Sequence, residues 1–157
     1  MFRLHFKGEN GSVTSAKGFT ANGICAGVKA SNTTKKDLAL IYCDKVCNSA
    51  AIFTKNLVKS DTIYVTKKHL ENGMAQAVVV NSGNANACNP DGYKKAEKMC
   101  SLAADALGVD ENDVIVASTG VIGQPLPIEP IASGIEKLKG TLSKDGGSSA
   151  AEAIMTT

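Results

Sequence analysis

The segment Ala-Val-Val-Val-Asn-Ser-Gly-Asn-Ala-Asn-Ala at residues 77–87 passes from an apolar, β-forming run into a turn of small and amide side chains. Residues 114–123, Val-Ile-Val-Ala-Ser-Thr-Gly-Val-Ile-Gly, follow the same plan. Short apolar runs of this kind are typical of strands buried in an α/β sheet. Ligands of such sheets gather at the carboxyl ends of the strands, so both turns are candidate positions for a site.

The second turn carries the groups that acyl chemistry needs. Gly120 leaves a backbone N–H open to a closely approaching ligand, and Thr119 offers a hydroxyl or a second N–H beside it. Donors in such a pair stabilise the negative charge that develops on an acyl oxygen. A simpler interpretation is also open, in which both turns are tight strand exits packed against their neighbours.

Length and composition narrow the class of protein. With 157 residues, 43% hydrophobic and 20% charged, the chain is typical of a globular protein with one core. The net charge of +2 and the scattered lysines give no pattern typical of nucleic-acid binding. Residues 1–7 alternate like a strand, and no apolar run is long enough for a signal peptide or a membrane span. We expect a single domain over residues 1–157 that binds neither nucleic acid nor membrane.

Cysteine and histidine give no metal or triad pattern. Cys43 and Cys47 are four residues apart, without a nearby histidine to complete a zinc site. The odd number of cysteines and the absence of a C-x-x-C pair favour buried, reduced thiols in a cytoplasmic protein. His5 and His69 are isolated, so no metal is expected. Nucleophilic catalysis would therefore use a hydroxyl, carboxylate or thiol, or a group from another chain. The full set of cysteines is Cys25, Cys43, Cys47, Cys88 and Cys100.

Extended structure is predicted for the first half of the chain. Residues 13–30 indicate extended chain with turns at their glycines. Thr66 is expected to cap a helical turn over residues 67–71, which ends at Asn72–Gly73. The apolar and β-branched runs predict strands at residues 38–43, 50–54, 62–66 and 75–81.

Helices are predicted for the second half. Apolar residues recur at helical spacing over 93–107, with Gly108 as the stop, and again over 128–142, with prolines at the start. Ser149 and Glu152 form a capping-box pattern for a third helix that begins at Ala150. Only about one turn follows before Thr157, so we expect the natural sequence to continue. Strands followed by alternating helices and strands predict a layered α/β sandwich, with the strand order left open.

Several stretches resemble the ornithine acetyltransferase (ArgJ) family. They are Val-Val-Val-Asn-Ser-Gly-Asn-Ala-Asn-Ala-Cys at 78–88, Ala-Ser-Thr-Gly-Val-Ile-Gly at 117–123 with Pro-Leu-Pro behind it, and Ala-Ala-Glu-Ala-Ile-Met-Thr-Thr at 150–157. Residues 17–21 and 38–40 also fit the family's opening. The correspondences run in family order over nearly the whole chain. The resemblance implies an ArgJ/DmpA-like fold, a layered sandwich of mixed β-sheets with flanking helices.

The resemblance also implies an activity. Such enzymes belong to arginine biosynthesis and move an acetyl group from N-acetylornithine to glutamate, without a bound cofactor, and some members also accept acetyl-CoA. Family precursors cleave themselves into α and β chains, and the new N-terminal threonine of β is the nucleophile. The family's Lys-Gly-Ser-Gly segment and Ala-Thr-Met-Leu junction do not occur here. The chain is thus expected to be an α-chain fragment, inactive alone, that assembles into a heterotetramer of two α and two β chains.

Site residues follow from the same resemblance. Thr119 and Gly120 match the family's oxyanion-hole pair, and Thr157 lies in a segment that contributes to substrate binding in the family. Residues on the first turn are expected to line or brace the same cleft: Asn81, Ser82, Gly83, Asn84 and Asn86. A purely structural role for this turn stays open, because asparagine side chains commonly bond turn backbone.

Two other functions compete with the acetyltransferase. One is a phosphate- or nucleotide-binding α/β domain that uses the glycine turns as anion nests. The chain contains neither G-x-x-x-x-G-K-[ST] nor G-x-G-x-x-G, the patterns that such domains need. The other is a non-catalytic assembly module, which folds with a partner and performs no chemistry.

Overall fold

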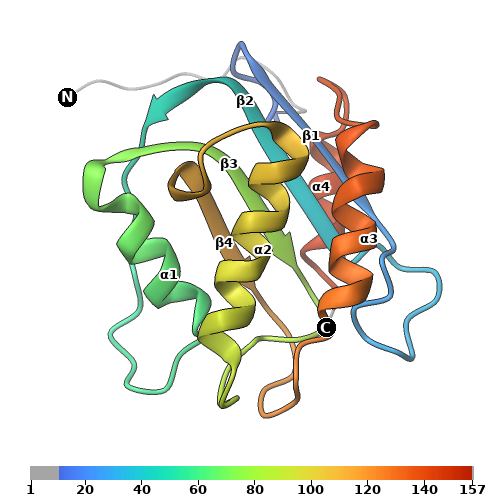
Figure 1. Ribbon diagram of the computed structural model, residues 1–157. Helices are drawn as coiled ribbons and strands as arrows, with labels where there is room; N and C mark the ends of the chain where they lie inside the picture. Colours follow the sequence, from blue (N-terminus) through green and yellow to red (C-terminus); the bar gives the residue numbers. More distant parts are fainter. Residues whose placement is uncertain (1–10, 157) are drawn as a thin grey trace.

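The computed structural model describes residues 11–156, so the strand expected at residues 1–7 and the candidate residue Thr157 lie outside the described residues. Helices and strands alternate through the second half of the chain (Figure 1). In chain order the elements are β1 (Phe19–Ile24), β2 (Leu38–Asn48), α1 (Thr62–His69), β3 (Met74–Asn81), α2 (Gly92–Leu107), β4 (Val114–Ser118), α3 (Ile128–Lys139) and α4 (Gly147–Ala153), with short 3-10 turns at Leu70–Asn72 and Glu111–Asp113.

The strands form one mixed sheet in the order β1-β2-β3-β4. β1 pairs with β2 and β2 with β3 in antiparallel fashion, whereas β3 and β4 are parallel. The parallel register runs from Ala77 opposite Val114 to Asn81 opposite Ser118. α2 makes the crossover that a parallel pair requires. The two strands quoted from the sequence are therefore neighbours, and their carboxyl ends lie side by side.

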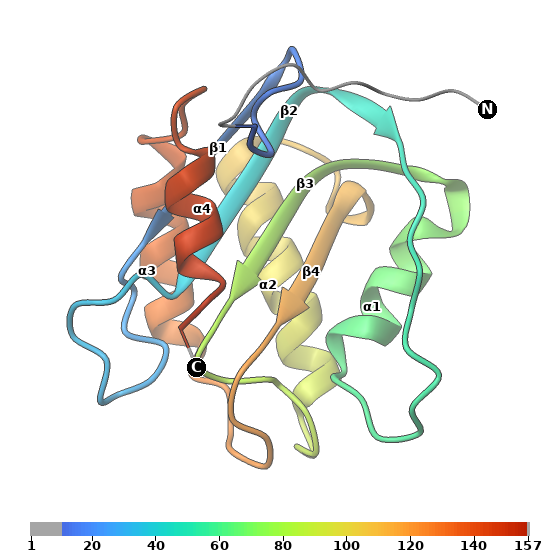
Figure 2. The same ribbon diagram turned by 180° about the vertical axis from the view of Figure 1, so that it is seen from behind.

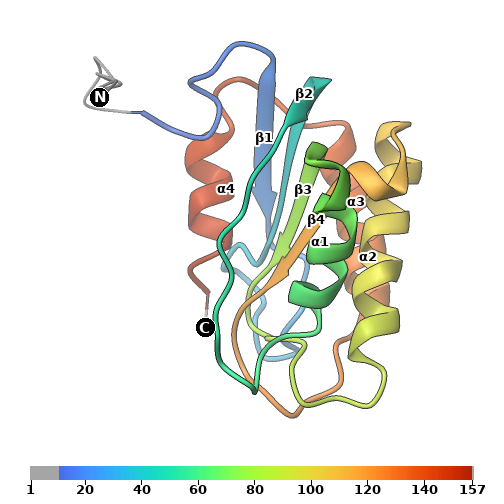
Figure 3. The same ribbon diagram turned by 90° about the vertical axis from the view of Figure 1, so that its left-hand side faces the viewer.

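The layers of the predicted α/β sandwich are present around this sheet. Helices α1, α2 and α3 cover one face, and α4 lies on the other (Figure 3). Seen from behind, α4 lies over β1 and β2, whereas β3 and β4 carry no helix on that side (Figure 2). α4 packs through small residues, since Ala150 and Ala153 meet Ala21 and Ala39.

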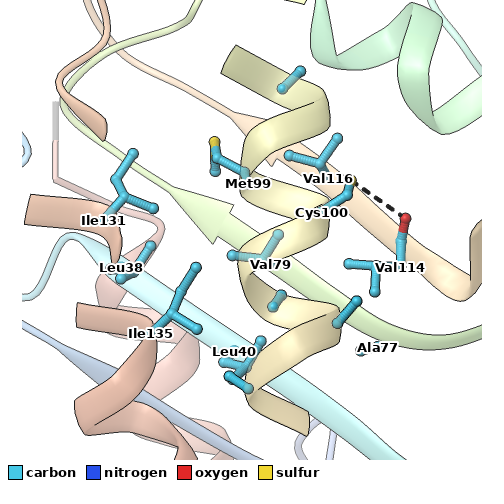
Figure 4. Close-up of a cluster of buried hydrophobic side chains, with 14 of the residues drawn as sticks. Leu38, Leu40, Ala77, Val79, Met99, Cys100, Val114, Val116, Ile131 and Ile135 are labelled. Carbon is cyan, nitrogen blue, oxygen red and sulfur yellow. Dashed lines mark hydrogen bonds between the residues drawn. The ribbon is translucent and has the colours of Figure 1, made fainter. Parts of the chain in front are cut away.

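The main core lies between the sheet and the helices α2 and α3 (Figure 4). The helical spacing read from the sequence is confirmed, because the apolar residues of both helices face this core. Gly108 ends α2 as expected, with a φ of +70°. α3 ends at Lys139, three residues short of the prediction. The core residues labelled in Figure 4 are Leu38, Leu40, Ala77, Val79, Met99, Cys100, Val114, Val116, Ile131 and Ile135.

The strand predicted at residues 62–66 is wrong, because this segment is the helix α1. The Thr66 hydroxyl donates to the Val116 carbonyl at 2.7 Å and accepts from the Val116 N–H at 3.2 Å. His69 Nδ1 lies 2.8 Å from the Val114 carbonyl oxygen. α1 thus supplies hydrogen-bond partners to the edge strand β4, and this tertiary contact outweighs the β propensity of its residues. Thr66 is therefore inside a helix and does not cap one, although the segment ends at Asn72–Gly73 as predicted.

Two other predictions for local structure are wrong. Residues 50–54 form no strand: the Ile52 side chain is fully exposed, and the segment pairs with no strand among residues 11–156. α4 begins at Gly147 rather than Ala150, and Ser149 does not act as its cap. Instead, Lys36 Nζ donates to Ser149 Oγ at 3.0 Å and pairs with a Glu152 carboxylate oxygen at 2.8 Å. The expected capping box is replaced by a contact between α4 and the chain before β2.

The cysteines are less uniformly buried than predicted. All five are free thiols, but only Cys43 and Cys100 are buried, and Cys88 is exposed. Burial raises the pKa of the Cys100 thiol to about 12, so this side chain stays protonated in the core. No helix within residues 11–156 combines the length and apolar character needed to cross a membrane.

Candidate active site

The two turns remain paired after the strands end. Successive backbone bonds join residues 81–87 to residues 119–123, so the segments that share a sequence plan also lie together. The bonds run from Thr119 N–H to Asn81 O (3.0 Å), from Ala85 N–H to Val121 O (2.9 Å) and from Gly123 N–H to Ala87 O (2.9 Å). The two turns named as candidate positions in the sequence are therefore neighbours at the carboxyl ends of β3 and β4, although the sequence left the strand order open.

Gly120 sits where the two turns touch most closely. Its φ is +132°, a region that L side chains rarely adopt. A Cβ at this position would collide with the backbone of Gly83 and Asn84. Both the conformation and the space therefore require glycine, and the Gly120 amide is held against a rigid neighbouring turn.

Only part of the expected donor set is free. The Thr119 N–H is used by the Asn81 carbonyl, so it cannot serve a ligand. Within residues 11–156, the Gly120 N–H and the Thr119 hydroxyl have no hydrogen-bond partner. Both residues are half-buried. Within the described residues, the structure thus leaves one backbone N–H and one hydroxyl of adjacent residues without a partner.

This pattern differs from an anion nest. A nest needs successive N–H groups that point into one concavity. Here the N–H groups on both sides of Gly120 are occupied, because Thr119 bonds Asn81 and Val121 bonds the Gly83 carbonyl at 3.4 Å. A single amide with an adjacent hydroxyl suits one developing oxyanion better than a phosphate group.

The first turn is buried and bonded to its surroundings. Asn81, Ser82, Asn84 and Asn86 are each at most 4% exposed. Their side-chain bonds reach β4, α4 and the segments on either side. The Ser118 hydroxyl donates to Asn81 Oδ1 at 2.6 Å, Asn81 Nδ2 donates to Asn84 O at 2.8 Å, Ser82 Oγ donates to Ala153 O at 2.6 Å, and Asn84 Nδ2 donates to Gln124 O at 3.1 Å.

These bonds favour a bracing role for Asn81, Ser82 and Asn84, and substrate contact by them stays a prediction. Gly83 and Asn84 also line a hollow of about 280 Å³, together with Lys29, Gln124 and three prolines, Pro125, Pro127 and Pro130. Thr119 and Gly120 are not among the residues that line it. The hollow therefore adjoins the Gly120 turn through Gly83 and does not contain the donor pair.

The sequence analysis missed Asp37, which organises the loop beside this turn. Its carboxylate is fully buried and accepts the N–H groups of Ala26 at 2.6 Å and Val28 at 2.9 Å. The amide of Asn32 donates to the same group at 2.7 Å. The backbone carbonyl of Asp37 accepts the Ser82 N–H. The sequence did offer a signal, since an aspartate stands directly before a predicted buried strand. A carboxylate buried there needs hydrogen-bond donors, which the neighbouring loop supplies.

Asp61 and Asn86 meet at the start of α2. The Asp61 carboxylate lies close to the Cα of Gly92, and Asn86 Oδ1 is buried without a partner among the described residues. Asn86 Nδ2 donates to the Gly92 carbonyl at 2.8 Å. Desolvation by burial raises the pKa of Asp61 above its ordinary value. Across residues 11–156, no three histidine, cysteine or acidic side chains converge in a way that could hold a metal ion.

Comparison with protein families gives a match along most of the chain. The sequence model of the ArgJ family matches residues 20–157. The arginine biosynthesis bifunctional protein ArgJ of Caldanaerobacter subterraneus is 48% identical over 149 residues, which are 94% of this chain and 36% of that protein. The ArgJ protein of Symbiobacterium thermophilum is 48% identical over 148 residues, which are 94% of this chain and 37% of that protein. The chain therefore spans little more than a third of the length of these curated relatives.

Solved structures give the same result for the fold. The crystal structure of the arginine biosynthesis bifunctional protein argJ from Bacillus halodurans superposes with a TM-score of 0.85 at 41% identity, over 94% of this chain and 76% of that chain. Ornithine acetyltransferase from Mycobacterium tuberculosis, solved in complex with ornithine, gives a TM-score of 0.86 at 37% identity. That superposition covers 93% of this chain and 79% of the other. These similarities agree with the mixed, layered architecture described above.

Proposed function

This chain belongs to the ArgJ family, and on that basis we propose that it is the α-chain part of an acetyltransferase in arginine biosynthesis. The enzyme moves an acetyl group from N-acetylornithine to glutamate, in the cytoplasm. The family match over residues 20–157 carries this proposal. Acetyl-CoA is a second acetyl donor to test.

The chain forms one domain, residues 1–157, of a larger self-cleaving precursor. The relatives are nearly three times as long as the matched segment. As in the family that the chain resembles, the nucleophilic threonine belongs to the β chain, and the family's junction motif does not occur among these 157 residues. On this proposal the chain supplies the oxyanion hole and is inactive by itself.

The reaction proceeds by covalent acyl transfer in two halves. The β-chain threonine hydroxyl, activated by a base, attacks the acetyl carbonyl of N-acetylornithine. A C–O bond forms, the C–N bond breaks, and ornithine leaves with the proton on its amine. The amine of glutamate then attacks the acetyl-threonine and frees the hydroxyl. In both halves the carbonyl oxygen becomes negatively charged for the lifetime of the tetrahedral intermediate.

The available donors at residues 119–120 support this role for the chain. The Gly120 N–H and the Thr119 hydroxyl stabilise the oxyanion, and neither is occupied by another described group. The Thr119 N–H, bonded to Asn81, holds the turn in place. Because backbone bonds on both sides fix the Gly120 amide, this donor would cost little reorganisation when charge develops.

The face of the sheet that α4 leaves open is the proposed surface for the β chain. Figure 2 shows that no helix covers β3 and β4 on this side. Val78, Ile115 and Ala117 alternate along these strands with core residues and are half-buried and apolar. The apolar side chains of Ile52 and Leu57 are almost fully exposed in the loop before α1. Large exposed apolar surfaces mark interaction sites. Two α and two β chains would then form the complete enzyme.

The decisive experiment is reconstitution. We expect the 157-residue chain alone to show no acetyl transfer from N-acetylornithine to glutamate, and to gain it when mixed with the β chain from the same reading frame. Acetyl-CoA with glutamate is assayed in parallel. Activity of the chain alone, or a stable complex of both chains without activity, would contradict the proposal. Replacing Val78 by Asp should prevent assembly, whereas Lys94→Glu, on the outer face of α2, should not.

A further inference from the structure

Two cysteines on β2 lie in contact although four residues separate them in the sequence. The Cys47 thiol donates to Cys43 Sγ at a sulfur–sulfur distance of 3.4 Å. Four residues of regular strand would span about 13 Å. The pairing of β2 with β3 shifts register between Tyr42 and Cys47, and this bulge folds the strand back enough to bring the thiols together.

In the chain by itself the pair is accessible from one side. Cys43 is buried and Cys47 is half-buried. Both line a hollow of about 140 Å³ on the face of the sheet that carries no helix over β3 and β4, with Phe19 and Gln76 among its other walls. A disulfide needs a sulfur–sulfur distance of about 2.05 Å, so the two sulfur atoms must approach by only about 1.4 Å.

We propose that Cys43 and Cys47 form a redox-active dithiol that closes to an intramolecular disulfide by exchange with a small-molecule disulfide. The Cys47 thiolate attacks one sulfur of the small disulfide, which breaks that S–S bond and releases one thiol. Cys43 then attacks the Cys47 sulfur and displaces the second thiol. Two protein thiols are oxidised and one small disulfide is reduced to two thiols, which carry the two protons.

The position of the pair favours the second of these steps. Cys47 is the more exposed sulfur and reacts first, and Cys43 is already in contact with it. The hydrogen bond to Cys43, followed by desolvation and the nearby charges of Cys43 and Asp44, raises the pKa of Cys47. The first step is therefore slow at neutral pH, and closure follows quickly because the resolving thiol is in place.

The dithiol is separate from the candidate active site. Cys47 pairs with Ala75 at the amino end of β3, whereas Asn81 and the turn beside Gly120 lie at the carboxyl end. The inference therefore does not depend on the oxyanion turn, and it concerns the chain by itself, because Val78 and Ile115 of the proposed β-chain surface line the same hollow. A disulfide here would fix the bulge in β2 without touching the oxyanion turn.

The test uses the reduced 157-residue chain and oxidised glutathione at mildly alkaline pH. We expect intact mass to fall by about 2 Da, as two hydrogens are lost, and peptide mapping to join Cys43 to Cys47. Cys43→Ser should instead keep glutathione on Cys47, because the resolving thiol is gone. Cys47→Ser, at the less buried position, should also abolish closure.

Cys88→Ser is the matched control, since Cys88 is exposed and lies outside the pair. This variant should still lose about 2 Da. Three results would overturn the proposal: a stable glutathione adduct on Cys47 in the unmodified chain, a disulfide that joins any other two cysteines, or modification of Cys88 while Cys43 and Cys47 both stay reduced.

Discussion

The two turns that end β3 and β4 share a sequence plan but differ in what their polar groups do. At residues 81–87 the side chains are buried and bonded to the protein, from Ser118 on β4 to Ala153 on α4. At residues 118–123 the chain is half-exposed, and no group within residues 11–156 bonds the Gly120 N–H or the Thr119 hydroxyl. These bonds favour a bracing role for the first turn, and the donors of the second turn are those that we propose to meet the substrate.

This contrast separates stability from catalysis. A buried polar group that loses its partner costs folding free energy, whereas a free donor at the surface contributes little to folding. Changes in residues 81–87 should thus lower stability and change the rate constant little. Changes at Thr119 should lower the rate constant and leave stability almost unaltered. The four predictions below test this separation, beginning with the largest effect.

Thr119→Ala removes the hydroxyl of the proposed donor pair. In the reconstituted enzyme we expect kcat to fall by about two to three powers of ten, roughly 3–4 kcal/mol in barrier height, with KM near normal. Thr119→Ser keeps a hydroxyl and should retain most of the activity. Steady-state kinetics measure both variants, and thermal melts should show little change. An unaltered kcat in Thr119→Ala would remove this residue from the oxyanion hole.

Asn81→Ala removes the central bonds of the buried turn. The Ser118 hydroxyl and the Asn84 carbonyl lose their partners, which should cost roughly 2–3 kcal/mol of unfolding free energy. Urea denaturation of the chain measures this loss. Asn56→Ala is the control, because Asn56 is exposed and its side chain makes no bond to a described residue. Equal stability of the two variants would show that the buried network is not a brace.

Ser82→Ala tests the link between the first turn and α4. The Ser82 hydroxyl donates to the Ala153 carbonyl at 2.6 Å, so its loss should cost about 1 kcal/mol. Hydrogen exchange should accelerate in α4 and remain unchanged in α2. Ser148→Ala, at an exposed position of α4, provides the comparison. Uniform acceleration over both helices would mean that the contact is not local.

Asp61→Asn should give the smallest effect and has a defined sign. Burial raises the pKa of Asp61 in the folded chain above the ordinary value of 3.8, so folding disfavours the ionised carboxylate. The stability contributed by this group is present below that value and is lost as pH rises through the folded-state pKa. Asp61→Asn should therefore melt at a slightly higher temperature at pH 7, and the difference should vanish near pH 3.

Thermal melts between pH 3 and pH 8 measure this change. Asp105→Asn, at an exposed position of α2, is the control for removing one negative charge. A lower melting temperature of Asp61→Asn at pH 7 would contradict this prediction. It would mean that the ionised carboxylate stabilises the fold near Asn86.

The sequence by itself determined the elements whose signals are periodic. Apolar residues at helical spacing predicted α2 and α3, and the continuous β-branched runs predicted β3 and β4. These predictions are correct because each helix buries its apolar face, and each strand its apolar residues, against the same core. The glycine at position 120 also marked the second turn correctly, since no other residue fits its backbone.

Only the tertiary structure decided what the neighbours of each segment are. Thr62–His69 has strand-like residues, but the bonds of Thr66 to Val116 on the edge strand make it a helix. The sequence offered either the hydroxyl or the N–H of Thr119 as a donor, and only the fold shows that Asn81 accepts the N–H. The contact between Cys43 and Cys47 likewise arises only at the bulge in β2. Local propensity records what a residue tolerates, whereas hydrogen-bond partners distant in sequence exist only after the chain has folded.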